Sequence, residues 1–110
     1  MENMTLRELC DAIGVSRRAV QGYEKAGLAS ASGKNKYGHL LYNEKMQGRI
    51  EKILLFQQLG FTIKEVKDLI DAPDDVLKAA FEKQVKVLIQ KREYMKTLID
   101  KVNELIEKLL

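Results

Sequence analysis

The sequence predicts a mainly α-helical chain in two parts. Residues 1–73 should form a small unit of short helices with one β-hairpin, and residues 74–110 should form a single long helix. Two observations predict this division. In the first part, apolar residues recur at helical spacing in short runs that end at glycines or at Pro73. In the second part, the helical pattern continues to Leu110 without a Gly or a Pro.

Composition limits the class of protein. The 110 residues suffice for one small domain and an added element, and an apolar content of 45% is ordinary for a folded chain. A single cysteine excludes a disulfide framework within the chain and fits a reducing cytoplasm. The sequence has neither a secretory signal nor an apolar run of membrane-spanning length. We therefore expect a cytoplasmic protein with no membrane partner.

Positive charge is concentrated in the first half. Residues 1–60 carry nine Lys or Arg against six Asp or Glu, whereas residues 61–110 carry ten against ten. Most of the excess lies between Arg17 and Arg49. A basic first half joined to a neutral second half is typical of a nucleic-acid-binding face attached to a different element.

Two short helices joined by a tight turn are predicted first. Thr5 and Glu8 form a capping box, and the helix that they begin should end at Gly14. Ser16 is an N-cap for a second helix, which Gly27 should end. Helix, glycine turn and helix make a helix-turn-helix pattern, although the same pattern also occurs in helical proteins with no DNA-binding role.

The second helix carries the predicted base contacts. In a helix-turn-helix, the first residues of the second helix enter the DNA major groove. Arg17 and Arg18 would contact guanine edges or phosphates there, and Gln21 would contact an adenine one turn further on. The alternative is that the two arginines are only solvated.

A basic β-hairpin is predicted next. Residues 29–36 are small and polar with no helical period, and Gly38 indicates a turn between two short strands. A small basic hairpin beside a helix-turn-helix is a wing, which lies along the phosphate backbone. Its candidate contacts are Lys34, Lys36, Tyr37 and His39. The alternative is a flexible loop in which Tyr37 and His39 are ordinary turn residues.

Two more helices should complete the first part. Asn43 can cap a helix over residues 44–59, and Gly60 should end it. Thr62 should begin a fourth helix, which Pro73 breaks. Lys64 lies in the first turn of this fourth helix, where a cation opposes the helix dipole. A nearby phosphate would compensate for it, so Lys64 is a further candidate DNA contact, with plain exposure as the alternative.

The long helix carries an apolar stripe. From Phe81 to Leu109, apolar residues follow one another at spacings of four and three, interrupted by Arg92, over roughly four heptads. A helix of about 35 residues would be about 50 Å long, which is more than the first part can cover. Such a stripe marks a partner, most simply the same helix of a second chain. The predicted interface residues are Val85, Leu88, Met95, Ile99, Val102, Ile106 and Leu109.

The parts together make a winged helix-turn-helix followed by a dimerisation helix. In this order, and in its residues, the chain resembles the MerR family of transcriptional regulators, reduced to a DNA-binding head and a dimerisation helix. The resemblance runs through most of residues 4–70. The matching motifs are Gly14-Val15-Ser16, Arg18, Tyr23-Glu24, Gly27-Leu28, Gly38 with Tyr42, and Leu59-Gly60-Phe61-Thr62 with Glu65-Val66.

The resemblance implies a homodimer that binds two half-sites in a promoter. Family members bend and untwist the spacer between the promoter elements so that RNA polymerase can engage both, at a cost of a few kcal/mol that extra contacts offset. It also implies that the long helices pair antiparallel, whereas the heptads alone would equally permit parallel pairing. Metal-sensing relatives hold their ion with cysteines at the dimerisation helix. This chain has none there, so we expect neither a metal nor another cofactor.

Departures from the family leave an alternative open. Gln21 and Gly22 stand where the family usually has Arg and Tyr, and His39-Leu40 stands where the wing usually has Tyr-Arg. The alternative is a degenerate winged-helix dimer that binds a protein rather than DNA. An enzyme is not expected, because a lone His and a lone Cys offer no nucleophile with its base.

The sequence also leaves the mode of regulation open. No effector-binding domain follows the long helix in these 110 residues. A repressor or constitutive binder, a regulator with an effector in the dimer interface, and a fragment of a longer regulator all fit.

Overall fold

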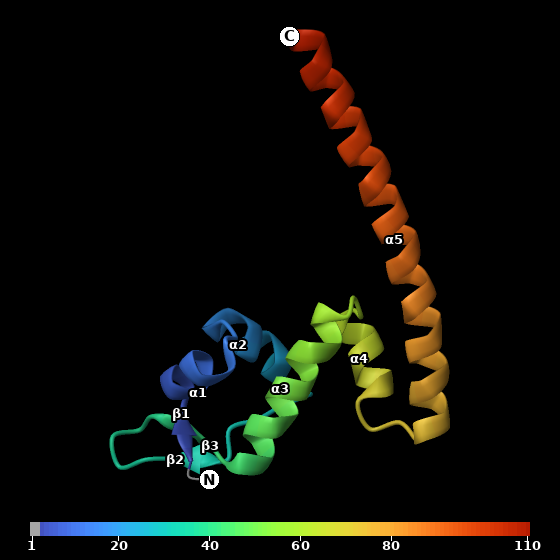
Figure 1. Ribbon diagram of the computed structural model, residues 1–110. Coiled ribbons are helices and arrows are strands. Elements are labelled where there is room, and N and C mark those ends of the chain that lie inside the picture. The colour runs from blue at the N-terminus through green and yellow to red at the C-terminus, as the bar shows by residue number, and fades with distance from the viewer. Residues whose placement is uncertain (1–2) are drawn as a thin grey trace. The chain divides into compact units, whose positions relative to one another are not determined.

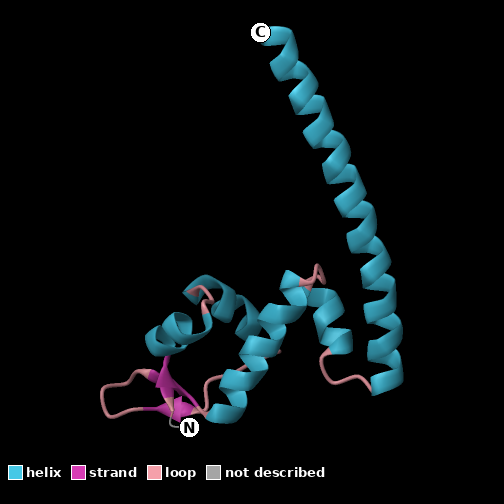
Figure 2. Cartoon of the chain, viewed as in Figure 1, coloured by secondary structure: helices cyan, strands magenta, loops and turns pink. Residues whose placement is uncertain are grey.

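The computed structural model describes residues 3–110 (Figure 1). Its elements in chain order are β1 (Met4–Thr5), α1 (Leu6–Ile13), α2 (Arg17–Lys25), β2 (Gly33–Lys34), β3 (Leu40–Tyr42), α3 (Glu44–Gln58), α4 (Ile63–Leu69) and α5 (Asp74–Leu109). They fall into two units, one that ends at Asp71 and one that begins at Ala72. Figure 2 shows the helices and the small sheet, which confirm the predicted mainly α-helical fold with a wing and a long final helix.

Side-chain caps fix where the helices begin. In α1, the Thr5 hydroxyl accepts a hydrogen bond from the Glu8 N–H (3.3 Å), and the Glu8 carboxylate accepts one from the Thr5 N–H (2.9 Å). Thr62 and Glu65 form the same reciprocal pair at α4. Ser16 caps α2 by accepting from the Ala19 N–H at 3.0 Å. These caps satisfy amides that have no partner within their helix, so the predicted starts are confirmed.

Two glycines end their helices in the same way. Gly27 has a φ of 78°, and its N–H donates a hydrogen bond to the Glu24 carbonyl. The next N–H, that of Leu28, donates to the Tyr23 carbonyl. Gly60, at φ 105°, repeats this pattern at the end of α3. Such backbone angles favour glycine, and the paired bonds satisfy the last carbonyls of each helix.

The sheet has one more strand than the sequence predicted. Strand β3 lies in the centre of an antiparallel sheet with the order β1-β3-β2. Met4 pairs with Tyr42 and Thr5 with Leu41 on one side, and Lys34 pairs with Leu40 on the other. The predicted hairpin therefore forms, and β1 attaches it to the residue that caps α1.

The core of the first unit lies between the helices and β3. Its fully buried large side chains are Leu9, Val20, Tyr23, Tyr42, Ile50, Ile53 and Val66. One polar side chain, Gln47, is also buried, and its amide donates to the Tyr42 carbonyl at 2.9 Å. This bond gives the buried Gln47 amide a partner, without which its burial would cost free energy.

Helix α5 is a single helix of 36 residues, about 54 Å long at 1.5 Å per residue. Asp74 and Asp75 lie in its first turn, where negative charge complements the helix dipole. The seven residues of the predicted dimer interface are all exposed along it, from 39% for Leu88 to 86% for Leu109. Within residues 3–110, no helix is both long and apolar enough to cross a membrane.

Candidate nucleic-acid interface

Helix α2 presents its basic residues outward because its apolar residues anchor it. Val20 is fully buried and Tyr23 is 2% exposed, and the Tyr23 phenol donates a hydrogen bond of 2.7 Å to the Gln57 side chain of α3. By contrast, Arg17, Arg18 and Gln21 are exposed. The three predicted base contacts therefore lie on the solvent side of a helix that is held firmly from behind.

Two further residues share this exposed side. Gly22 and Lys25 are both exposed, and they follow Arg18 at intervals of four and three residues. Residues at these spacings are neighbours on one face of a helix. We call the surface formed by Arg17, Arg18, Gln21, Gly22 and Lys25 the α2 face.

The tip of the wing is a hydrogen-bonded turn. The Asn35 side-chain oxygen accepts hydrogen bonds from the N–H groups of Tyr37 (2.9 Å) and His39 (3.0 Å), and Gly38 adopts a φ of 81°. An Asn side chain that accepts from the backbone two residues ahead is a common turn-forming device. These bonds argue against the alternative of a structureless loop between the strands.

The turn displays cationic and aromatic side chains to solvent. Tyr37 is 72% exposed, and the Lys36 ammonium lies 5.1 Å from the centre of its ring, within the range of a cation–π contact. The ring of His39 follows at 6.4 Å from that of Tyr37. Lys34 is exposed on β2.

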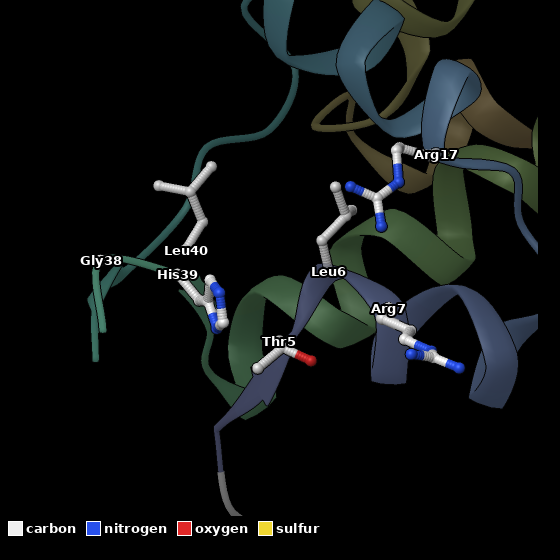
Figure 3. A pocket seen from close by; sticks show the side chains of 7 residues that line it. All are labelled: Thr5, Leu6, Arg7, Arg17, Gly38, His39 and Leu40. Carbon is white, nitrogen blue, oxygen red and sulfur yellow. The ribbon is translucent and has the colours of Figure 1, made fainter. Parts of the chain in front are cut away.

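A hollow of about 560 Å³ joins α1, the start of α2 and the wing. Figure 3 shows the side chains that line it, which are Thr5, Leu6, Arg7, Arg17, Gly38, His39 and Leu40. Two predicted contacts, Arg17 and His39, thus line one hollow although they come from different elements. Lys34, Lys36, Tyr37 and Lys64 are exposed but do not line this hollow.

Arg7 is the residue that the sequence analysis missed. It lies in the first turn of α1, in the motif Thr5-Leu6-Arg7-Glu8, and Lys64 holds the same place in Thr62-Ile63-Lys64-Glu65. Both are cations in the first turn of a helix, where they oppose the dipole. The reasoning that selected Lys64 would have selected Arg7 as well.

Arg49 forms hydrogen bonds that stabilise the first unit. Its guanidinium forms two parallel hydrogen bonds with the Asp71 carboxylate, at 3.0 and 3.1 Å, and its Nε donates to the Leu28 carbonyl. This fork-shaped pairing joins α3 to the end of α2 and to the segment after α4. The bond from Arg49 lowers the pKa of the Asp71 carboxyl. Because Arg49 is paired with Asp71, the net positive charge that residues 17–49 offer to a binding partner is smaller than the sequence count suggests.

Cys10 is half-buried in α1. Burial raises the pKa of its thiol, although the charge of Arg17 acts in the opposite direction. The thiol form is a poor nucleophile, which fits a packing role. Within residues 3–110, no three His, Cys, Asp or Glu side chains cluster as a metal site requires.

Two family models match the chain. The model of the MerR HTH family regulatory protein matches residues 4–73, which include α1, α2 and the wing. The model described as MerR, DNA binding matches residues 48–110, from α3 to the last residue of the chain.

Individual proteins agree with these models. The HTH-type transcriptional activator mta of Bacillus subtilis is 29% identical over 98 residues, which are 89% of this chain and 38% of mta. The chain therefore spans well under half the length of that relative. The crystal structure of a MerR family transcriptional regulator from Bacillus cereus has a TM-score of 0.84 and 25% identity, and the likeness covers 96% of this chain and 81% of that one.

A third likeness concerns the fold alone. HiNmlR, described as a MerR family regulator lacking the sensor domain and bound to promoter DNA, has a TM-score of 0.70 at 21% identity. The likeness covers 89% of this chain and 79% of HiNmlR.

Proposed function

Because the chain belongs to the MerR family of helix-turn-helix regulatory proteins, we propose that it is a sequence-specific DNA-binding transcriptional regulator that acts as a homodimer on a promoter. The α2 face is the observation that carries this proposal. It presents two adjacent arginines beside a basic wing, and all of these side chains are exposed. Residues 1–73 would be the DNA-binding domain and residues 74–110 the dimerisation helix.

The α2 face reads the major groove. Arg17 and Arg18 lie at the start of α2, which is the part of a recognition helix that reaches base edges. A guanidinium can donate two hydrogen bonds to a guanine, and the Gln21 amide one turn later can pair with an adenine. Base contacts of this kind give sequence specificity.

The wing and the hollow hold the DNA backbone. Arg7 and His39 line the hollow and suit a phosphate there, while Leu6 and Leu40 add apolar surface that suits a deoxyribose ring. Further phosphate contacts come from Lys34, Lys36, Tyr37 and Lys64. Contacts of this type position a protein and make its affinity depend on salt.

Helix α5 joins two chains. Its exposed apolar residues, from Val85 to Leu109, would be covered by the same helix of a second chain, paired antiparallel as the family resemblance implies. A two-fold dimer then sets the distance between two DNA half-sites.

At a promoter, the dimer would distort the spacer between two promoter elements so that RNA polymerase engages both. The family membership supports this step, as does the promoter DNA bound to HiNmlR. The cost of such bending is a few kcal/mol, which the phosphate contacts would offset. We place this activity in the cytoplasm and assign no cofactor to it.

The second candidate function is a dimer that binds a protein. Leu40, at the edge of the hollow, is 38% exposed, and Gly22 leaves no side chain at the centre of the α2 face. Both positions would suit an apolar partner better than a phosphate. Salt separates the two functions, because counterion release weakens DNA binding steeply as salt rises, whereas an apolar protein interface responds little.

Selection of binding sites from random duplex DNA, at two salt concentrations, tests the proposal. The wild-type chain should enrich an inverted-repeat site and lose affinity for it as salt rises. A variant with both Arg17→Ala and Arg18→Ala should lose the enrichment, while a control with Lys101→Ala on α5 should retain it. If no sequence is enriched and salt abolishes only weak binding, the head does not read DNA specifically and a protein partner becomes the better function.

A further inference from the structure

Three cations interrupt the apolar side of α5. Lys91, Arg92 and Lys96 lie within about 7.5 Å of one another along the helix axis, at 1.5 Å per residue. Arg92 stands where the apolar stripe requires an apolar residue, and Lys91 and Lys96 flank the stripe, one on each side. All three side chains are exposed in the single chain. A second chain that covers the stripe would bring them into the interface.

The same three cations line a hollow on α5, which we call the α5 hollow. Its volume is about 450 Å³, and Leu88, Met95 and Ile99 supply the rest of its lining. These apolar side chains are 39%, 56% and 55% exposed, so they are free to contact a ligand or a second helix. The α5 hollow therefore combines positive charge with apolar surface.

The chain itself provides little negative charge to these cations. Within residues 3–110, one ion pair involves them, and it joins the Arg92 guanidinium to the Glu93 carboxylate at 3.6 Å. Both side chains of this pair are largely exposed, at 72% and 62%, and such a pair contributes little free energy. Lys91 and Lys96 have no ion pair in the same part of the chain.

A second copy of α5 cannot provide the missing charge. The residues that face a paired helix stand at positions a, d, e and g of each heptad. When Val85 is assigned to position a, none of these positions between residues 84 and 110 is Asp or Glu. The acids of this segment all stand at the outward positions b and f, and they are Glu93, Asp100, Glu104 and Glu107.

This result does not depend on the direction of pairing. Antiparallel chains whose stripes overlap fully place residues 91–96 opposite residues 98–103, and parallel chains place residues 91–96 opposite the same residues. Neither arrangement brings an inward acid to the cations. Charges that leave water without a partner oppose association, so the cations need a negative group from elsewhere.

Arg92 alone would have a simpler explanation. A single polar residue at an a position can fix the register of a coiled coil at some cost in stability. That role does not require Lys91 and Lys96, which add repulsion between the two chains. The group of three, placed around one hollow, indicates a ligand of opposite charge.

We propose that the α5 hollow is part of a binding site for an amphipathic anion and that the second chain of the dimer completes this site. The three cations hold the acid group of the ligand, a carboxylate or a phosphate, and the apolar lining contacts its apolar part. An antiparallel dimer has two such sites. The inference rests on the proposed function for the homodimer and adds a class of effector to it. A ligand that binds the dimer and not the monomer increases the fraction of chains that are paired.

Octanoate is the probe for this site. It carries a carboxylate on an apolar chain, whereas 1-octanol carries the same chain without a charge. Calorimetry on the full chain should find one octanoate bound per chain, with 1-octanol and inorganic phosphate each bound about tenfold more weakly. Octanoate at about ten times its Kd should lower the dissociation constant of the dimer about a hundredfold, because two ligands bind each dimer. Sedimentation would measure this shift.

Substitutions in the hollow should separate the ligand from the interface. Arg92→Leu should weaken octanoate binding about tenfold and should tighten the dimer without ligand, because leucine restores the apolar stripe. Lys96→Gln should also weaken octanoate binding. Lys86→Gln is the matched control, since Lys86 is an exposed lysine of α5 at an outward position, and it should bind octanoate as the wild type does.

Several results would overturn the inference while the proposed function stands. These are a dimer whose dissociation constant octanoate does not change, 1-octanol or phosphate binding as tightly as octanoate, and equal loss of binding in Lys86→Gln. If the wild-type chain does not dimerise at any concentration, the homodimer of the proposed function fails and the inference fails with it.

Discussion

The phenol of Tyr42 donates a hydrogen bond of 2.8 Å to the Glu24 carboxylate, and this bond joins the central strand of the wing sheet to α2. Tyr42 is fully buried. Burial and the bond to Glu24 raise the pKa of the Tyr42 phenol, which therefore stays protonated and able to donate at physiological pH. One residue thus connects the two elements that carry most of the proposed DNA contacts.

Loss of the Tyr42 hydroxyl should destabilise the first unit. Tyr42→Phe leaves the Glu24 carboxylate without this donor and should reduce the free energy of unfolding by about 1–2 kcal/mol, as expected for a partly buried bond to a charged group. Urea denaturation would measure the change. Tyr37→Phe is the control, because that ring is 72% exposed and its change should stay within about 0.5 kcal/mol. Equal stability of both variants would show that the bond contributes little.

Arg18 should carry part of the sequence specificity. Arg18→Ala should cost about 1–3 kcal/mol in binding to the selected site if the guanidinium reads a base. The loss should be much smaller on unrelated DNA, because non-specific binding depends on phosphates. Fluorescence titration with both duplexes would distinguish these cases. Unchanged affinity for the selected site would remove Arg18 from the set of base contacts.

Arg7 should behave as a backbone contact. Arg7→Ala should weaken binding by a similar factor on all sequences and lower the salt slope by about one, since its place in the hollow suits a phosphate. Titration of specific and unrelated duplexes at several salt concentrations would measure both effects. Lys108→Ala, on α5, should change neither. A loss confined to one sequence would instead assign Arg7 to base reading.

The apolar side of α5 should control assembly. Ile99→Asp places a charge among exposed apolar residues of the predicted interface and should leave monomers in sedimentation. Lys101→Asp, two residues further along and on the other side of the helix, should leave the dimer intact. A dimer that persists in Ile99→Asp would place the interface elsewhere.

The Arg49–Asp71 pair should make stability depend on pH in the acid range. The pKa of Asp71 is lowered in the folded chain by the hydrogen bond from Arg49, so the pair stabilises the fold above the unfolded pKa of about 3.9. This contribution is lost as pH falls through the folded pKa. Asp71→Asn should therefore be less stable than the wild type at neutral pH, and the difference should shrink below about pH 4. Thermal unfolding between pH 7 and pH 3 would check this; a constant difference would mean that the pair is not responsible.

Local signals predicted the helix boundaries well. Thr5 with Glu8, and Gly27 at the end of α2, act on groups within five residues, so the sequence pattern contains the whole interaction. The wing hairpin was predictable for the same reason, because a glycine turn joins its two strands.

Non-local contacts were not predictable in this way. Strand β1 has only two residues, and Met4 pairs with Tyr42, which lies 38 positions further along the chain. No local sequence pattern therefore predicts this strand. The task of Arg49 also depends on groups far along the chain, Leu28 and Asp71. Arg7 lines one hollow with His39 and Leu40 of the wing because β1, which directly precedes α1, pairs with β3. The types of the elements could be read from the sequence, whereas the residues that meet between them could not.

The strand order of the wing sheet also bears on how the protein emerges from the ribosome. Strand β1 is made first, but its partner β3 is made about 40 residues later, and Gln47, which satisfies the Tyr42 carbonyl, later still. Until then the start of the chain has no sheet to join, and α1 and α2 have only each other. The wing sheet is therefore completed only when the beginning of α3 is available, and the hydrogen bond that anchors α2 to Gln57 forms later still, when the end of α3 has been made.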